Sequence, residues 1–61
     1  MIIIEATIKR PDSRGGDYIY DVERKVFKDD DTESIQNFLN KDFCYPYSKN
    51  ECSVNFNYLK L

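Results

Sequence analysis

The sequence contains no histidine and no tryptophan, and it has only two cysteines, two glycines and two prolines among 61 residues. Without histidine, the common acid–base partner of a nucleophilic serine or cysteine is missing. A zinc site needs about four nitrogen or sulfur ligands, which two cysteines do not supply. We therefore expect no enzyme, no catalytic residue, no metal site and no cofactor.

The N-terminal residues show neither a basic leader nor an apolar run long enough for a signal core or a membrane span, because Glu5 follows directly after Ile2–Ile4. We expect a cytoplasmic protein with no membrane segment. Cys44 and Cys52 lie eight positions apart, so a disulfide is geometrically conceivable. Disulfides are rare in the cytoplasm, and we expect reduced thiols.

The charge balance is mildly acidic, with eleven acids against nine bases. A general polyanion binder normally carries a strong basic excess, so nucleic acid is an unfavoured partner. The length fits a single small domain over residues 1–61, and such a chain buries only about 60% of its unfolded surface. Self-association or a partner would add stability.

Alternating apolar residues predict two strands at the start of the chain. Residues 2–9 place Ile2, Ile4, Ala6 and Ile8 on one face, and the glycine-containing segment Pro11–Gly16 predicts a hairpin loop. In a second strand over residues 17–28, the alternation assigns Tyr18, Tyr20 and Val22 to the core face. The alternation breaks at Arg24–Lys25, where we expect a bulge that returns Val26 or Phe27 to the core.

The acidic segment Asp29–Glu33 predicts the start of a helix, because its oxygens can accept hydrogen bonds from free backbone amides. Capping explains this segment more simply than a cation site. The helix is expected to end near Phe43, since Pro46 disfavours helical geometry before it. Its apolar stripe consists of Ile35, Phe38, Leu39 and Phe43.

A polar loop over residues 45–51 precedes a third alternating strand over residues 53–61. A right-handed helical crossover would place this strand beside the first. The expected fold class is α+β, a two-layer ββαβ arrangement of a three-stranded antiparallel sheet of order 2-1-3 with one helix packed on one face. The third strand is expected to contribute Val54, Phe56 and Tyr58 to the core.

One helix leaves the other sheet face uncovered, and Ile3, Ile19 and Leu59 are expected there. That face is either solvated or buried by a partner, including a second copy in a homodimer. The two outer strands could also be extended by another strand. Tyr45 and Tyr47 flank Pro46 in the loop, where they either contact a partner or close the open end of the core. The predicted protein-binding residues are Ile3, Tyr18, Ile19, Tyr45 and Tyr47.

An alternative function is a small nucleic-acid-binding module, in which bases stack on tyrosines between basic side chains. Its candidate cations are Arg10, Arg14, Arg24 and Lys25. The predicted core face already contains Tyr18 and Tyr20. If they are buried they cannot stack on bases, which weakens this alternative.

Five tyrosines and four phenylalanines are more aromatic rings than so small a core needs. Surface tyrosine is typical of protein interfaces. A small acidic domain with exposed rings and no catalytic set resembles phage or mobile-element proteins that bind and disable a host protein. We therefore expect a small protein-binding regulator or inhibitor whose partner is another protein.

Overall fold

The computed structural model describes residues 1–48 and 50–61. Three strands and one helix follow in the order β1 (Ile2–Pro11), β2 (Tyr18–Phe27), α1 (Thr32–Leu39) and β3 (Ser53–Lys60). β1 pairs antiparallel with both other strands, so the strand order is β2-β1-β3. The expected α+β class, element order and sheet topology are confirmed.

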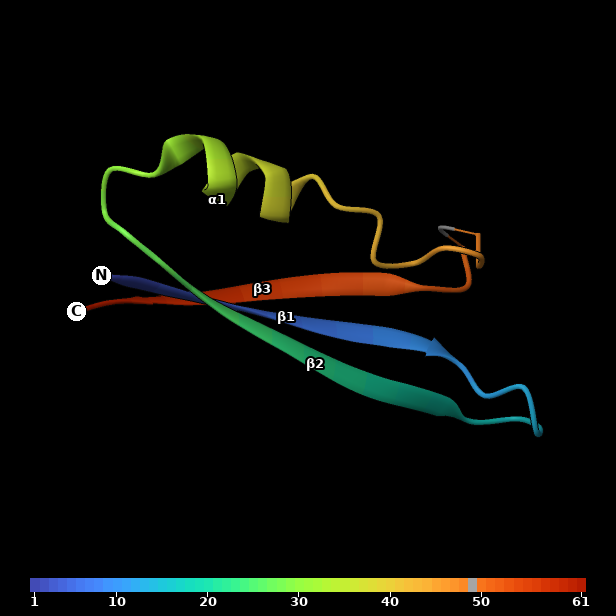
Figure 1. The fold of residues 1–61 in the computed structure, drawn as a ribbon. Helices are drawn as coiled ribbons and strands as arrows, with labels where there is room; N and C mark the ends of the chain where they lie inside the picture. The colour runs from blue at the N-terminus through green and yellow to red at the C-terminus, as the bar shows by residue number, and fades with distance from the viewer. Residues whose placement is uncertain (49) are drawn as a thin grey trace.

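The helix and the sheet form two layers. Figure 1 shows α1 above one face of the sheet, and in the described part of the chain no other helix covers the opposite face. We call the face beneath α1 the inner face and the other the outer face. Alternation along β1 sends Ile4, Ala6 and Ile8 to the inner face, where all three are buried.

The hairpin loop between β1 and β2 sets the register of the pair. The backbone amide of Asp12 donates to the Asp17 carbonyl over 2.9 Å, and that of Gly15 donates to the Asp12 carbonyl over 3.2 Å. Gly15 and Gly16 have φ angles of 130° and 49°, which side-chain-bearing residues rarely adopt. This turn places Pro11 opposite Tyr18, and the register continues to Ile2 opposite Phe27.

The expected orientation of β2 is wrong. Residues directly opposite each other in a sheet point to the same face. Ile8 faces the core and lies opposite Asp21, so Asp21 is an inner residue and its neighbours Tyr20 and Val22 are outer residues. Their exposed fractions of 62% and 60% agree. Ile19, which we assigned to the uncovered face, alternates with Asp21 and Glu23 on the inner face.

The expected bulge at Arg24–Lys25 is absent, because the pairing of β1 with β2 advances one residue at a time over the whole strand. Regular alternation alone takes Phe27 to the inner face, where it is 4% exposed, and leaves Val26 outside. The choice between the two residues that the sequence left open is thus settled in favour of Phe27. A register shift of one residue would exchange the two faces of β2.

The helix begins where the acidic segment predicts and ends earlier than expected. The Asp31 carboxylate caps it by accepting a hydrogen bond from the Ser34 amide over 3.2 Å. The helix ends at Leu39, and Asn40 caps its C-terminus. Phe43 lies beyond the helix and still packs on the core, because the chain after Asn40 continues over the inner face (Figure 1).

Phe38 is at the centre of the aromatic cluster in the core. Its ring meets those of Phe27, Phe43 and Phe56 edge to face, at centroid distances of 5.6, 5.4 and 6.3 Å. Such pairs add about 0.5–1.5 kcal/mol each beyond the apolar area they bury. Tyr58, which we expected in this core, is exposed beside it. The buried side chains are those of Ile4, Ala6, Ile8, Phe27, Phe38 and Cys52.

We predict that Phe38→Ala lowers the free energy of unfolding by about 3–5 kcal/mol, because it removes a buried ring and leaves a cavity. Ile8→Val should cost about 0.5–1.5 kcal/mol by the same mechanism. The matched control is Tyr20→Ala on the outer face, which should change stability by at most about 0.5 kcal/mol. Urea denaturation measures all three, and a loss from Tyr20→Ala as large as that from Ile8→Val would contradict the face assignment of β2.

Candidate protein-binding surface

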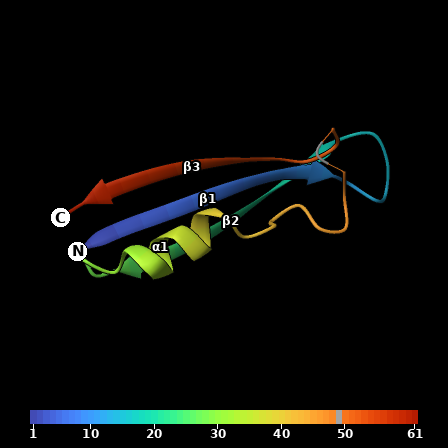
Figure 2. The ribbon, with the colours of Figure 1, turned by 90° about the horizontal axis from the view of Figure 1, so that it is seen from above.

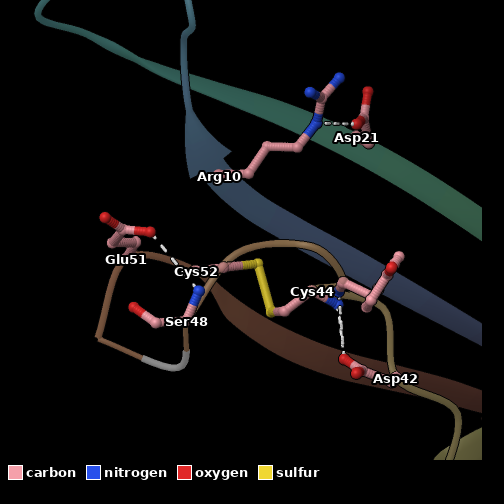
Figure 3. The surroundings of a disulfide bond; sticks show 8 residues. Arg10, Asp21, Asp42, Cys44, Ser48, Glu51 and Cys52 are labelled. Carbon is pink, nitrogen blue, oxygen red and sulfur yellow. Dashed lines mark hydrogen bonds and ion pairs between the residues drawn. A yellow bond between two sulfur atoms is a disulfide. The ribbon is translucent and has the colours of Figure 1, made fainter.

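A disulfide joins the segment after the helix to the start of β3. Cys44 and Cys52 are bonded, with their Cα atoms 5.7 Å apart, and Cys52 is buried in the core (Figure 3). The expectation of two reduced thiols is therefore wrong. The chain turns back between Phe43 and Ser53 to enter β3, and this reversal brings the two cysteines within the bonding range.

Hydrogen bonds between residues close in sequence fix the conformation of the loop that the disulfide closes. One Asp42 carboxylate oxygen accepts from the amides of Cys44 and Tyr45 over 3.1 and 3.2 Å, and the Tyr47 amide donates to the Cys44 carbonyl over 2.7 Å. Lys49, in the predicted loop, lies outside the described residues. Tyr45 is 81% exposed, whereas Tyr47 packs against the core, so only Tyr45 is free for a partner.

The acids on the inner side of β2 are neutralised by two ion pairs. Arg10 Nε lies 2.6 Å from an Asp21 carboxylate oxygen, and Figure 3 shows these side chains meeting between β1 and β2. Lys41 Nζ lies 3.0 Å from a Glu23 carboxylate oxygen. The Asp21 carboxylate, and to a smaller extent the Tyr47 hydroxyl, raise the pKa of Arg10 above its ordinary value. These pairs allow charged residues to stand beside the core.

The outer face carries an exposed apolar stripe along β2, which we call the β2 stripe: Tyr18, Tyr20, Val22 and Val26. Each of these side chains is more than half exposed. At the same end of the face as Val26, Ile3 of β1 lies between Val26 and Leu59 of β3. Leu59 is also more than half exposed, so the apolar surface crosses the sheet from β2 to β3.

Charged side chains on the outer face are paired with their neighbours. Arg24 donates two hydrogen bonds to one carboxylate oxygen of Glu5, its cross-strand partner, over 2.6 and 3.1 Å. Lys9 Nζ lies 4.3 Å from the centroid of the Tyr18 ring, which is a cation–π distance. A shallow hollow of about 390 Å³ on the outer face involves all three strands and is lined by Ile3, Glu5, Arg24, Asn57, Tyr58 and Leu59.

The five predicted binding residues do not form one surface. Ile3 and Tyr18 are outer residues, but they stand at opposite ends of the sheet, about 26 Å apart along the strands. Ile19 lies on the inner face opposite Arg10, and Tyr45 and Tyr47 belong to the loop on that side. The outer face therefore keeps Ile3 and Tyr18 from the predicted set.

Sequence reasoning missed most of the β2 stripe, because the stripe has the alternation of a core face. The signal that could have found it is the length of the hairpin loop. With Pro11 opposite Tyr18, counting back along both strands pairs Lys9 with Tyr20 and Thr7 with Val22, which puts both on the face opposite to Ile8.

The acidic segment before α1 caps the helix and binds the chain terminus. The Asp29 carboxylate accepts a hydrogen bond from the Met1 ammonium, which holds the pKa of Asp29 below its usual range. Among residues 1–48 and 50–61, no cluster of three or more potential metal ligands occurs. No helix in this part of the chain has the length and apolar character needed to cross a membrane.

Comparison of the chain with protein-family models, with curated proteins and with solved structures gives no match. The outer face is therefore interpreted from its own chemistry.

We predict that reduction of the Cys44–Cys52 bond lowers the free energy of unfolding by about 2–3 kcal/mol, since it frees a short loop in the unfolded chain. The measurement is urea denaturation with and without a thiol reductant. The double variant Cys44→Ser/Cys52→Ser is the control and should not respond to the reductant. Two titratable thiols in the native, unreduced protein would contradict the disulfide.

Proposed function

We propose that the protein is a small protein-binding regulator or inhibitor that contacts its partner with the outer face of the sheet. One observation carries the proposal, which is the β2 stripe on a face that no described helix covers. A monomer rarely leaves a large contiguous apolar patch in water, and such patches mark interaction sites. Tyrosine and arginine are also the residues that most often carry binding energy at interfaces.

The chain offers little support for catalysis as an alternative. It has no histidine, the common acid–base partner of a serine or cysteine nucleophile. A nucleophile would have to be a lysine, a hydroxyl or a carboxylate in an enclosed pocket. The hollow on the outer face is shallow and open, which suits a protein surface rather than a reaction centre.

As expected from the sequence, we propose that the partner is a host protein, that binding takes place in the cytoplasm, and that the source is a phage or mobile element. In that compartment the cysteines are kept reduced. The proposal therefore requires the reduced protein to remain folded, which the denaturation experiment with a reductant also measures.

The face assignment provides a matched pair of test variants. Leu59 and Lys60 are adjacent in β3, both are exposed, and they point to opposite faces of the sheet. We predict that Leu59→Glu weakens capture of the partner at least tenfold, a change of about 1.4 kcal/mol, whereas Lys60→Glu does not. The measurement is a pull-down from host lysate, quantified by mass spectrometry, followed by titration of the captured protein.

Urea denaturation serves as the control that both variants remain folded. Equal weakening by the two substitutions, or weakening by Lys60→Glu alone, would place the binding surface elsewhere. Tyr47→Ala is not a suitable variant, since Tyr47 packs against the core and its loss would destabilise the fold.

A second candidate is a single-strand nucleic-acid platform, and the orientation of β2 favours it. Tyr18 and Tyr20 are on the open face rather than in the core, with Lys9 beside them and Arg24 farther along the same face, beyond Val22. Of the four cations we first considered, only Arg24 lies on this face. Arg10 and Lys25 are inner residues and Arg14 is in the hairpin loop.

This candidate predicts that a labelled single-stranded oligonucleotide binds with an affinity that falls as salt rises. Tyr20→Ala should weaken that binding by about 1–3 kcal/mol through lost stacking, and Tyr58→Ala should not. Fluorescence polarisation at two salt concentrations measures both effects. Absent or salt-independent binding would eliminate the candidate.

A further inference from the structure

The chain has more surface than a folded monomer of its mass. Its accessible surface is 4881 Å², whereas a 7.3 kDa monomer is expected to have about 4,200 Å². Its radius of gyration is 13.2 Å, against about 10.5 Å for a domain of this length. The excess of about 700 Å² is close to the roughly 800 Å² that each partner buries in a standard interface.

Of the two edges of the sheet, the free edge of β2 is the better suited to pairing with another strand. β2 runs for ten residues without a bulge or a proline, and Figure 2 shows it at one side of the sheet. Tyrosine, valine and isoleucine, which favour strands, occupy half of its positions. Long, regular edges pair readily with another strand unless charged side chains oppose it, so the charged residues of β2 decide which register is allowed.

The other edge is less suited to pairing. β3 has eight residues, and its outward side chains include Ser53, Asn55 and Asn57. Asparagine is depleted in strands. Length and composition therefore favour β2 over β3 for pairing with another strand.

A second copy of the chain fits the β2 edge in one central register. Two identical strands that pair antiparallel are related by a two-fold axis, and the residue on the axis faces its own copy. If Asp21, Glu23 or Arg24 were on the axis, its side chain would face the same charge on the second copy. Val22 is uncharged, so a two-fold axis at Val22 brings no like charges together there. The central positions are Asp21, Val22, Glu23 and Arg24.

We propose that two copies of the chain pair through β2 about a two-fold axis at Val22. The product is a six-stranded sheet with both helices on the same face. On the outer face, Tyr20 then lies opposite Arg24 of the second copy, a cation–π arrangement, and Tyr18 lies opposite Val26. The two β2 stripes become neighbours across the new junction.

The inner face of this junction is compatible with the same register because its acids already have cationic partners. In the dimer Asp21 lies opposite Glu23 of the second copy, which would repel if both were unpaired. Arg10 neutralises Asp21 at 2.6 Å and Lys41 neutralises Glu23 at 3.0 Å within each chain. The ion pairs thus neutralise the two acids that face each other across the junction, while Lys25, the remaining charged inner residue of β2, lies opposite Ile19 of the second copy.

This dimer does not depend on the proposed protein-binding function. Pairing at the edge leaves the central part of each outer face open, so a dimer could still bind a partner there. Its test uses purified protein alone, and its failure would leave the lysate experiment unaffected.

The first measurement is the mass in solution by light scattering across a concentration series. We expect twice 7.3 kDa for the wild-type chain and 7.3 kDa for Val22→Glu, which puts two carboxylates together at the axis. The matched control, Asn55→Glu, lies on the outer face of β3 and should remain dimeric. A wild-type mass of 7.3 kDa at 100 µM, or dissociation by Asn55→Glu in place of Val22→Glu, would overturn the proposal.

The second measurement fixes the register by cross-linking. In the Val22→Cys variant, the new cysteines of the two copies should form a disulfide on oxidation. Residues opposite each other in a sheet have Cα atoms about 4.5–5.5 Å apart, which is within the bonding range. Tyr20→Cys alone should not, because the two copies of that position are about 13 Å apart along the strands. A mixture of Tyr20→Cys and Arg24→Cys should cross-link.

Peptide mapping under non-reducing conditions separates these bonds from Cys44–Cys52. Equal cross-linking of Val22→Cys and Tyr20→Cys would contradict the register. Cross-linking of Asn55→Cys in their place would assign the interface to β3 and overturn the proposal.

Discussion

The pairing of β1 with β2 decides which side chains of this protein meet the core and which meet the solvent. The loop of residues 12–17 holds Pro11 opposite Tyr18, and every later pair follows from that first one. Because strand side chains alternate, the loop selects one of two opposite orientations for the whole of β2. The orientation selected places the more apolar side of β2 outside, where the β2 stripe is available for contacts.

This orientation has consequences on the inner face. β2 contributes Phe27 to the core. The inner face of β2 also carries the acids Asp21 and Glu23, which are paired with neighbouring cations. Arg10 comes from the central strand and Lys41 from the segment after the helix, so the ion pairs connect β2 to both layers. The short helix and its aromatic cluster cover one part of the inner face, and the disulfide-bonded loop continues along the rest (Figure 1).

The sequence predicted the topology well because the signals for it are local. Alternation marks the strands, the acidic segment marks the start of the helix, and the crossover rule orders the sheet. The orientation of β2 was not predicted, since its outer side has the composition of a core and only the turn geometry distinguishes the two. Phe43 was assigned to the core correctly but to the helix wrongly, because packing of the ring does not require helical backbone. The disulfide was missed because compartment arguments say nothing about where the fold brings two cysteines.

β1 pairs on both of its edges, with β2 and with β3, yet it is synthesised before either of them. Pairing of Ile2 with Lys60 joins residues from nearly opposite ends of the sequence, and contacts of that kind form slowly. Until β3 is made, the isoleucines of β1 adjoin an unpaired backbone edge, as in a nascent chain that is prone to wrong associations. The central strand of the finished sheet therefore keeps one edge unpaired until β3 is synthesised.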